Sequence, residues 1–476
     1  MRQPGRAARL SVGILITALA LAFTSAAGAA RYLVVYKNED VPKNAAAAIQ
    51  RAGGQLVLSY DSIGVAIADS PLDSFAAVLA GENKVDGVSA LDGLSFGLEH
   101  DSTDFEGDLP NIPATDTDTF SSLQWNMRQI HAPEAHAITG GNPAVVVGLL
   151  DSGIDYTHPD LAQNIDFADS ASCVSGVPDQ NPQAWNDDNV HGTHNAGTIA
   201  AASNGFGIVG VAPNVKLASV KVAQVSGLIT PAAVVCGFMW SATHHIDVTN
   251  NSYTIDVGGT TAADPLDFFC HNDPAQQPLI KAVKRSVRYA LKSGVSVVAS
   301  AGNSNIDLAN PPLGNECIRL PSELPGVIAV TATALSGEKA SYSNFGVGFT
   351  DVAAPGGDAV PAPPAGFVLS TWPAAIQVPR LMRDLAAPGP AYYRFMAGSS
   401  MAAAHVSGVA ALIISHYGDL RSPSNATMRP GRVEAYLQQT ATEVACPPDP
   451  SACQGDLGYN GFYGHGIVDA LAALTR

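Results

Sequence analysis

The chain has 476 residues, of which 46% are hydrophobic and only 14% are charged, and its formal net charge is −17. So acidic and so sparsely basic a composition disfavours binding to a phosphate backbone, and the large apolar fraction excludes intrinsic disorder. We therefore expect a folded protein that binds no nucleic acid, with about two to four domains by length.

Residues 1–29 are typical of a secretory signal peptide. Three arginines precede an apolar run over residues 10–23, and small residues at 27–29 fit a cleavage site. A membrane span needs about 20 apolar residues, so a retained anchor is the weaker alternative. We expect an exported chain that contacts no membrane after the signal is removed.

Six cysteines fit an exported protein, because export permits disulfides. Six cysteines allow 15 pairings, and metal ligation is the alternative, but no CxxC spacing supports a metal site. The last two cysteines flank a proline-rich hexapeptide and are expected to close a small loop. The pairs that we expect are Cys173–Cys236, Cys270–Cys317 and Cys446–Cys453.

Residues 31–98 predict a small α+β unit with the order β-α-β-β-α-β, which is typical of a ferredoxin-like fold. The expected strands lie near 32–36, 55–59, 63–68 and 85–95, and the helices near 43–51 and 71–80.

Residues 99–120 differ from the preceding unit in composition, since they contain several Asp and Glu and no Lys or Arg. They predict a flexible acidic linker that is open to cleavage, and an ordered acidic loop is the alternative.

Residues 121–476 predict an α/β domain built on a doubly wound, mostly parallel sheet. Short apolar runs alternate there with Ala-rich helical stretches. The expected strands are 144–150, 216–222, 248–252, 295–299 and 327–331, and the expected helices are 192–202, 230–244, 279–293 and 400–416.

Three polar residues stand at the ends of these elements: Asp151 after a strand, and His191 and Ser400 at helix starts. Each has a plain alternative, because Asp and Ser often cap turns and helices. His191 and His194 have a helical zinc spacing, but the Glu of an HExxH helix is absent. Together they offer a carboxylate, an imidazole and a hydroxyl, the groups that activate a serine nucleophile.

The segments DSGID, HGTHNAGT and GSSMAAAHVSG occur in this order, and with them residues 121–475 resemble the subtilisin-like serine endopeptidases (subtilase family, S8). The resemblance implies that Asp151 orients the imidazole, His191 is the general base and acid, and Ser400 is the nucleophile. Asn303, which follows Ala-Gly, would donate to the oxyanion together with the backbone N–H of Ser400.

The resemblance also implies the partners. Peptide or protein substrates would pair with the segment that contains Asn250 and Ser252. The 31–98 unit is similar to the family's propeptide, an intramolecular chaperone and inhibitor whose C-terminal end fills the cleft. The family needs no organic cofactor, and we expect a monomer.

Several positions depart from the family pattern. Val190 replaces a usual Gly, Asn195 a usual Val, and Ala404 a usual Pro. None of these three supplies a reacting atom, so we expect activity to be retained. Thr254-Ile255 replaces a Gly-Gly that walls the substrate groove. Two stretches look like insertions or remodelled loops, 254–289 and 354–394.

Arg319 falls where the family has a small residue at the floor of the primary specificity pocket. We hypothesise that it favours acidic or small side chains at P1, the substrate residue before the cleaved bond. The alternative is an Arg turned outward beside a Cys317 disulfide.

Asp160 and Asn204 have the spacing of a family calcium site. One carboxylate, one amide and backbone carbonyls suit Ca²⁺, so calcium is a second hypothesis. We expect no other metal site.

The sequence therefore predicts a secreted serine endopeptidase made as a self-inhibited pre-pro-protein. A dedicated processing protease of narrow specificity is one alternative, favoured by the remodelled groove residues. A catalytically inactive binding protein on the same fold is another.

Overall fold

A computed structural model describes residues 28–91, 98, 116–244, 246–253, 268–312, 314, 316–360, 364–420, 428–448 and 453–476. The signal-peptide prediction therefore lies almost wholly outside the described residues, as does most of the acidic linker. Thr254 and Ile255 also lie outside them.

The N-terminal unit is a four-stranded antiparallel sheet with two helices, in the strand order β2-β3-β1-β4. This confirms the predicted β-α-β-β-α-β pattern. Alternate residues of β1 face opposite ways, so Tyr32 and Val34 pack within the unit, while Leu33 and Val35 join the core of the larger domain. Its elements are β1 (Ala30–Tyr36), α1 (Ala45–Arg51), β2 (Gln55–Tyr60), β3 (Val65–Ser70), α2 (Phe75–Ala80) and β4 (Val85–Ala90).

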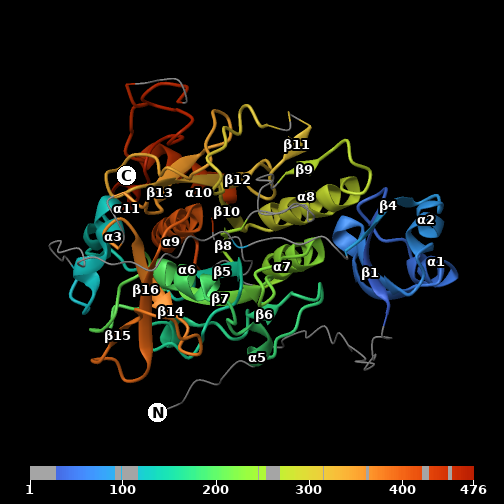
Figure 1. The fold of residues 1–476 in the computed structure, drawn as a ribbon, viewed down its shortest axis with the longest axis horizontal. Coiled ribbons are helices and arrows are strands. Elements are labelled where there is room, and N and C mark those ends of the chain that lie inside the picture. Colours follow the sequence, from blue (N-terminus) through green and yellow to red (C-terminus); the bar gives the residue numbers. More distant parts are fainter. Residues whose placement is uncertain are drawn as a thin grey trace, which may run out of the picture.

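The larger domain is built on a seven-stranded sheet in which every pairing is parallel, as predicted, with the order β13-β12-β10-β8-β5-β7-β6 (Figure 1). The five expected strands are present with ends shifted by one or two residues. The sequence analysis missed two short strands at the sheet edges, β6 and β13. The strands are β5 (Val146–Asp151), β6 (Ala171–Ser172), β7 (Lys216–Lys221), β8 (Val248–Asn251), β10 (Ser296–Ser300), β12 (Val327–Thr333) and β13 (Val352–Pro355).

Helices cover both faces of this sheet, which explains the continuous apolar runs of its strands. Val147 and Leu149 of β5 pack in the same core as α6 and α9. Val146 and Leu150 pack in the core of α7 and α8 on the opposite face. The helices are α6 (His191–Ala200), α7 (Pro231–Thr243), α8 (Gln277–Lys292) and α9 (Ser399–Tyr417).

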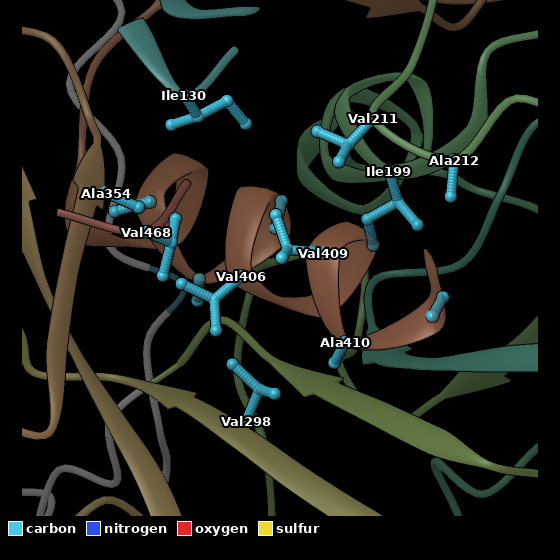
Figure 2. Close-up of a cluster of buried hydrophobic side chains, with 14 of the residues drawn as sticks. Ile130, Ile199, Val211, Ala212, Val298, Ala354, Val406, Val409, Ala410 and Val468 are labelled. Atoms are coloured by element: carbon cyan, nitrogen blue, oxygen red, sulfur yellow. The ribbon is translucent and has the colours of Figure 1, made fainter. Parts of the chain in front are cut away.

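Helix α9 is the centre of one core, as its apolar sequence predicts (Figure 2). Val406, Val409 and Ala410 are fully buried there, in the same cluster as Val298 of β10. Within the described residues, α9 is long and apolar enough to cross a membrane, but it is almost entirely buried inside the protein. It is therefore the core helix of this fold.

Smaller elements surround the seven-stranded sheet and the helices on its two faces. The proline-rich stretch 354–394 was expected to be a remodelled loop, and it contains most of a three-stranded antiparallel sheet, in the order β14-β16-β15. The remaining elements are α3 (Trp125–Gln129), α4 (Ala132–His136), α5 (Pro182–Trp185), β9 (Phe269–Cys270), β11 (Cys317–Ile318), β14 (Val368–Trp372), β15 (Met382–Asp384), β16 (Ala391–Met396), α10 (Pro430–Thr440) and α11 (Ala470–Leu474).

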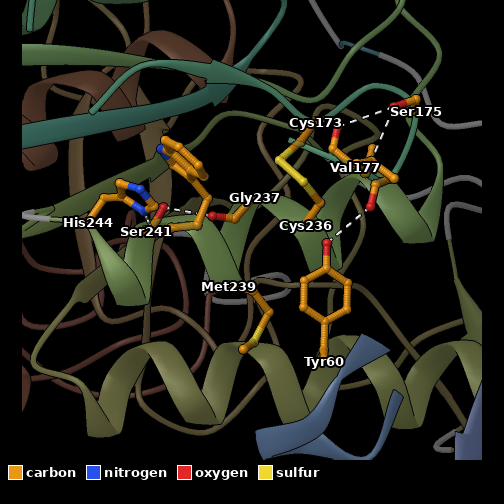
Figure 3. Close-up of a disulfide and its surroundings, with 12 residues drawn as sticks. Tyr60, Cys173, Ser175, Val177, Cys236, Gly237, Met239, Ser241 and His244 are labelled. Atoms are coloured by element: carbon orange, nitrogen blue, oxygen red, sulfur yellow. Dashed lines mark hydrogen bonds between the residues drawn. A yellow bond between two sulfur atoms is a disulfide. The ribbon is translucent and has the colours of Figure 1, made fainter. Parts of the chain in front are cut away.

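All three expected disulfides are present, Cys173–Cys236, Cys270–Cys317 and Cys446–Cys453. The first joins the end of β6 to α7, and the second joins β9 to β11. Figure 3 shows the first bridge with Tyr60 of the N-terminal unit beside it.

The N-terminal unit packs against α8 through a buried arginine. Arg285 of α8 donates from Nη1 to the carbonyl oxygens of Tyr36 and Ile63, each over 3.0 Å. Ion pairs Lys281–Asp86 and Arg288–Glu39 flank it. The unit is thus held to the larger domain by polar contacts as well as by the apolar face of β1.

Close packing of α9 generates a stability prediction. A methyl group at Gly408 would lie 2.5 Å from Cβ of Val211 on a neighbouring segment, whereas a methyl at Gly431 in α10 meets nothing within 4 Å. Gly408→Ala should lower the free energy of unfolding by about 1–3 kcal/mol through overpacking. The matched control Gly431→Ala should raise it by up to about 1 kcal/mol, since Ala favours a helix. Denaturant unfolding followed by tryptophan fluorescence measures both, and equal effects of the two variants would contradict this packing.

Candidate active site

Asp151 and His191 meet in the interior at the carboxyl end of β5. Asp151 is the last residue of that strand, His191 is the first of α6, and both are fully buried. Nδ1 of His191 lies 2.8 Å from Oδ1 of Asp151, and the same oxygen accepts the backbone N–H of Ser152 over 2.7 Å. The structure thus brings together two of the predicted residues in the geometry of a carboxylate that orients an imidazole.

The start of α6 is held by a buried carboxylate that sequence reasoning missed. Asp187 accepts the backbone N–H groups of Asn189, Val190 and Thr193, and the hydroxyl of Ser152. Val190 has φ 134°, a region that favours glycine and costs other residues about 1–3 kcal/mol. The Asp187 contacts offset this strain and fix the backbone immediately before His191. The position of Asp187, shortly before the predicted start of a helix, could have indicated this role in the sequence.

Ser400 lies in the first turn of α9, where backbone N–H groups lack partners within the helix and the helix dipole favours negative charge. Its hydroxyl donates to the carbonyl oxygen of Ser252 over 3.2 Å, and Ser252 donates its own hydroxyl to the carbonyl oxygen of Ser400 over 2.9 Å. Helix α9 also packs against α6, which carries His191. The predicted serine therefore lies at the start of α9, hydrogen-bonded to the residue that follows β8.

Asn303 follows β10 and lies beside the start of α9. Its Oδ1 accepts the backbone N–H of Ser399 over 2.8 Å, and the N–H of Gly302 donates to the hydroxyl of Ser399 over 3.1 Å. Since the amide oxygen is directed at Ser399, the NH₂ end remains as the donor of this side chain. Carboxyl ends of parallel strands commonly form sites in α/β sheets, and β5, β8 and β10 contribute to this one.

Asn250 differs from its expected place. It was predicted to contact substrate, but its backbone pairs on both sides within the sheet, with β10 and β5. Its side chain is fully buried, donating to Ser252 Oγ over 2.8 Å and accepting from Ser407 Oγ over 3.0 Å. A central strand has no free edge for a peptide, so Asn250 acts by supporting Ser252. Only the sheet order could have corrected this.

Arg319 is fully buried, so the outward-turned alternative is wrong. Its guanidinium lies so close to Gly302 that a side chain there would clash with Nη2, and it lies 5.5 Å from the ring centre of Phe268. Glu323 accepts the backbone N–H of Arg319, and burial raises the pKa of Glu323 to about 7 against the opposing effect of the arginine charge. The positively charged guanidinium of Arg319 thus lies next to Gly302, the residue that precedes Asn303.

The groups around Asp160 do not fit a calcium ion. Asn204 directs its NH₂ at Oδ1 of Asp160 over 2.9 Å, because its own oxygen accepts the N–H of Phe206. Oδ2 of Asp160 accepts the N–H of Ile208 and the hydroxyl of Tyr393, over 3.1 and 3.0 Å. Calcium needs oxygen lone pairs, and here donors surround the carboxylate. In the part of the chain described, no group of three His, Cys, Asp or Glu residues is placed to hold a metal.

Comparison with known proteins identifies the family. The model of the subtilase family matches residues 142–466, more than half of the chain. The chain belongs to the subtilase family. It is a serine-type endopeptidase, a hydrolase that acts on peptide substrates.

Two curated subtilases illustrate the relationship. The chain is 33% identical to subtilisin DY of Bacillus licheniformis over 71% of this chain and 93% of that protein. It is 31% identical to subtilisin Savinase of Lederbergia lenta over 74% of this chain and 98% of that protein.

Two solved structures are similar in fold. The epidermin leader peptide processing protease of Staphylococcus aureus has a TM-score of 0.69 at 22% identity, and the match covers 94% of this subtilase and 98% of that chain. A lanthipeptide protease has a TM-score of 0.58 at 26% identity, with 74% and 93% covered.

The Asp160 cluster predicts a pH dependence. Burial raises the pKa of Asp160 to about 8, far above the ordinary value of about 4, against the opposing effect of its three hydrogen-bond donors. Between these two pH values the folded state holds a proton that the unfolded state releases. The stabilisation from this neutral carboxyl is complete below pH 4 and is lost as the pH rises towards 8. Asp160→Asn cannot titrate, so the stability of wild type relative to this variant should fall between pH 5 and pH 8.

Thermal unfolding at both pH values, with 1 mM CaCl₂ or with a chelator, measures this difference. We expect the same result in either medium. A larger loss from Asp160→Asn in calcium than in chelator would instead make Asp160 a metal ligand.

Proposed function

We propose that this subtilase cleaves peptide bonds through Asp151, His191 and Ser400, by way of an acyl-enzyme. The observation that carries the proposal is the buried hydrogen bond from His191 to Asp151. The two helices that carry His191 and Ser400, α6 and α9, pack against each other. A serine hydroxyl is a weak nucleophile until an imidazole accepts its proton, and the imidazolium needs a fixed carboxylate.

Each residue then has one step. Ser400 Oγ attacks the scissile carbonyl while His191 accepts its proton, and Asp151 stabilises the imidazolium. The amide NH₂ of Asn303 and the backbone N–H of Ser400 donate to the oxyanion, a role in which one donor typically contributes about 10²–10³ in kcat. His191 returns the proton to the leaving amine, and water then releases the acyl group by the reverse sequence.

The N-terminal unit is proposed to be an inhibitory propeptide. Its attachment through Arg285 and the apolar face of β1 supports this role. Leu98, which follows the unit, packs against a core cluster of the larger domain and lies close to Gly227. The unit, and Leu98 after it, thus lie against the larger domain.

Export is proposed from three observations. The first residues have the composition of a signal peptide, and the described part of the chain carries three disulfides, which persist in oxidising compartments. The curated relatives are subtilisins. We propose that the mature enzyme is a secreted monomer.

Self-maturation tests the proposed chemistry. We expect the secreted wild-type chain to lose residues before about 121, because a working active site can cleave the acidic linker. Ser400→Ala should keep its N-terminal unit, and Ser399→Ala, which changes the neighbouring serine, is the matched control that should still mature. Intact-mass spectrometry of the three secreted proteins measures the outcome.

Two results would contradict this account. Cleavage of Ser400→Ala at the wild-type position would assign maturation to another protease. An uncleaved wild-type chain that also fails to hydrolyse an unstructured protein such as casein would remove the peptidase assignment of these residues.

Substrate preference is proposed to depend on Arg319. Its buried guanidinium behind Gly302 places a positive charge next to the loop that carries Asn303. We therefore propose that an acidic P1 side chain is favoured.

A peptide panel that varies only P1 measures this preference. Arg319→Met should lower kcat/KM for P1 Glu by about 10–100-fold relative to P1 Gln, as expected for losing one partner of a buried charge pair. Arg383→Met, which changes an exposed arginine of β15, is the control and should leave the ratio unchanged. A strong wild-type preference for Phe or Leu at P1 would overturn the idea.

A second candidate is a dedicated processing protease of narrow specificity. The lanthipeptide protease is a similar structure, and a buried arginine next to Gly302 would narrow the choice of substrates. Broad cleavage of casein would exclude this candidate.

A further inference from the structure

Asn195 lies one helical turn after His191 and contacts the carboxylate of Asp151. Its Nδ2 donates to Oδ2 of Asp151 over 3.0 Å and lies 3.3 Å from Nδ1 of His191. Asn195 is fully buried in α6. The side chain therefore donates to the carboxylate and lies beside the imidazole.

The orientation of this amide is fixed by charge. The opposite orientation would place the amide oxygen 3.0 Å from a carboxylate oxygen, where two acceptors repel. The NH₂ group must therefore face Asp151.

No other described group donates a hydrogen bond to Oδ2 of Asp151. Oδ1 of Asp151 accepts from Ser152 and His191, and the hydroxyl of Ser152 donates to Asp187 instead. Among the residues that the structure describes, Asn195 is the one recorded donor to Oδ2. Without it, a buried carboxylate oxygen would lack a partner, which is costly for a charged group.

Asn195 also lowers the stability of the folded state. Its Oδ1 is buried, and no described group donates to it. An unsatisfied buried oxygen is destabilising, and an apolar residue of similar size would avoid it. A group that the core does not need, but that the carboxylate uses, points to a role in the site.

We propose that Asn195 is a positioning residue, which holds the Asp151 carboxylate by Oδ2 so that Oδ1 stays directed at Nδ1 of His191. This proposal rests on the proposed triad. Asn195 acts only through Asp151 and His191. Its loss lets the carboxylate rotate and weakens stabilisation of the imidazolium in the transition state, while the substrate groove is unchanged. The effect should therefore fall on kcat and not on KM.

Steady-state kinetics on the matured enzyme tests the proposal. Asn195→Leu keeps the branching of the side chain and removes the donor, and it should lower kcat about tenfold with KM within about twofold, as expected for one hydrogen bond to a charged group. Asn195→Val is the second variant and should behave alike. Thr198→Val removes another buried hydrogen bond of α6, from the hydroxyl to the carbonyl oxygen of His194, and should leave kcat unchanged.

A second measurement does not need activity. In the full chain carrying Ser400→Ala, the proton of His191 Nδ1 should give a downfield NMR resonance, because it is held in a buried hydrogen bond to a carboxylate. Adding Asn195→Leu should shift or broaden that resonance, and adding Thr198→Val should not.

The two measurements separate the possible failures. An unshifted resonance, or an unchanged kcat in both Asn195 variants, overturns the positioning role and leaves the proposed function intact. A wild-type chain without peptidase activity overturns the proposed function, while the resonance still decides the role of Asn195. If Asn195→Leu and Thr198→Val lowered kcat and changed KM to the same extent, Asn195 would be only a structural part of α6.

Discussion

The hydrogen bond between Asp151 and His191 joins the end of the interior strand β5 to the start of α6, deep in the protein. Both groups are polar and fully buried, so the bond is sustained only where the surroundings satisfy them. The parallel sheet places the carboxylate, the Asp187 network fixes the turn before His191, and α9, which carries Ser400, packs against α6. We expect a change in the sheet, in the Asp187 network or in α9 to weaken the hydrogen bond between Asp151 and His191.

Much of the fold follows from patterns visible in the sequence. Runs such as 144–150 and 327–331 predict buried parallel strands because helices cover both faces of the sheet. The small edge strands β6 and β13 escape such analysis, since strands of two and four residues carry too little periodicity. The antiparallel strands within 354–394 escape it because prolines and glycines interrupt the stretch.

The candidate site could be predicted in part. Three motifs in order predict Asp151, His191 and Ser400 as the catalytic residues, since each motif combines a reactive residue with a strand or helix end. The buried position of Asn250 depends on sheet order, which local sequence does not contain. The contacts of Asp187 and Asn195 depend on which atoms meet in the folded core. The donors around Asp160 likewise come from Tyr393, more than 200 residues away.

Two departures from the family pattern share one physical theme. At Asp160, a hydroxyl and N–H groups surround a carboxylate where a cation was expected. At Asn195, an amide replaces an apolar side chain and bonds to the carboxylate of Asp151. In both places a buried carboxyl group is stabilised by donors from the chain itself. The chain thus keeps the subtilase architecture while changing how its buried acids are satisfied.

The most direct test of the account is labelling of the matured enzyme with a fluorophosphonate, followed by peptide mapping. The account predicts a single modified residue, Ser400, with Ser399 unmodified and with labelling nearly abolished in His191→Ala. Modification of another serine, or labelling of Ser400 at an unchanged rate in His191→Ala, would contradict the assembly of Asp151, His191 and Ser400 into one catalytic unit.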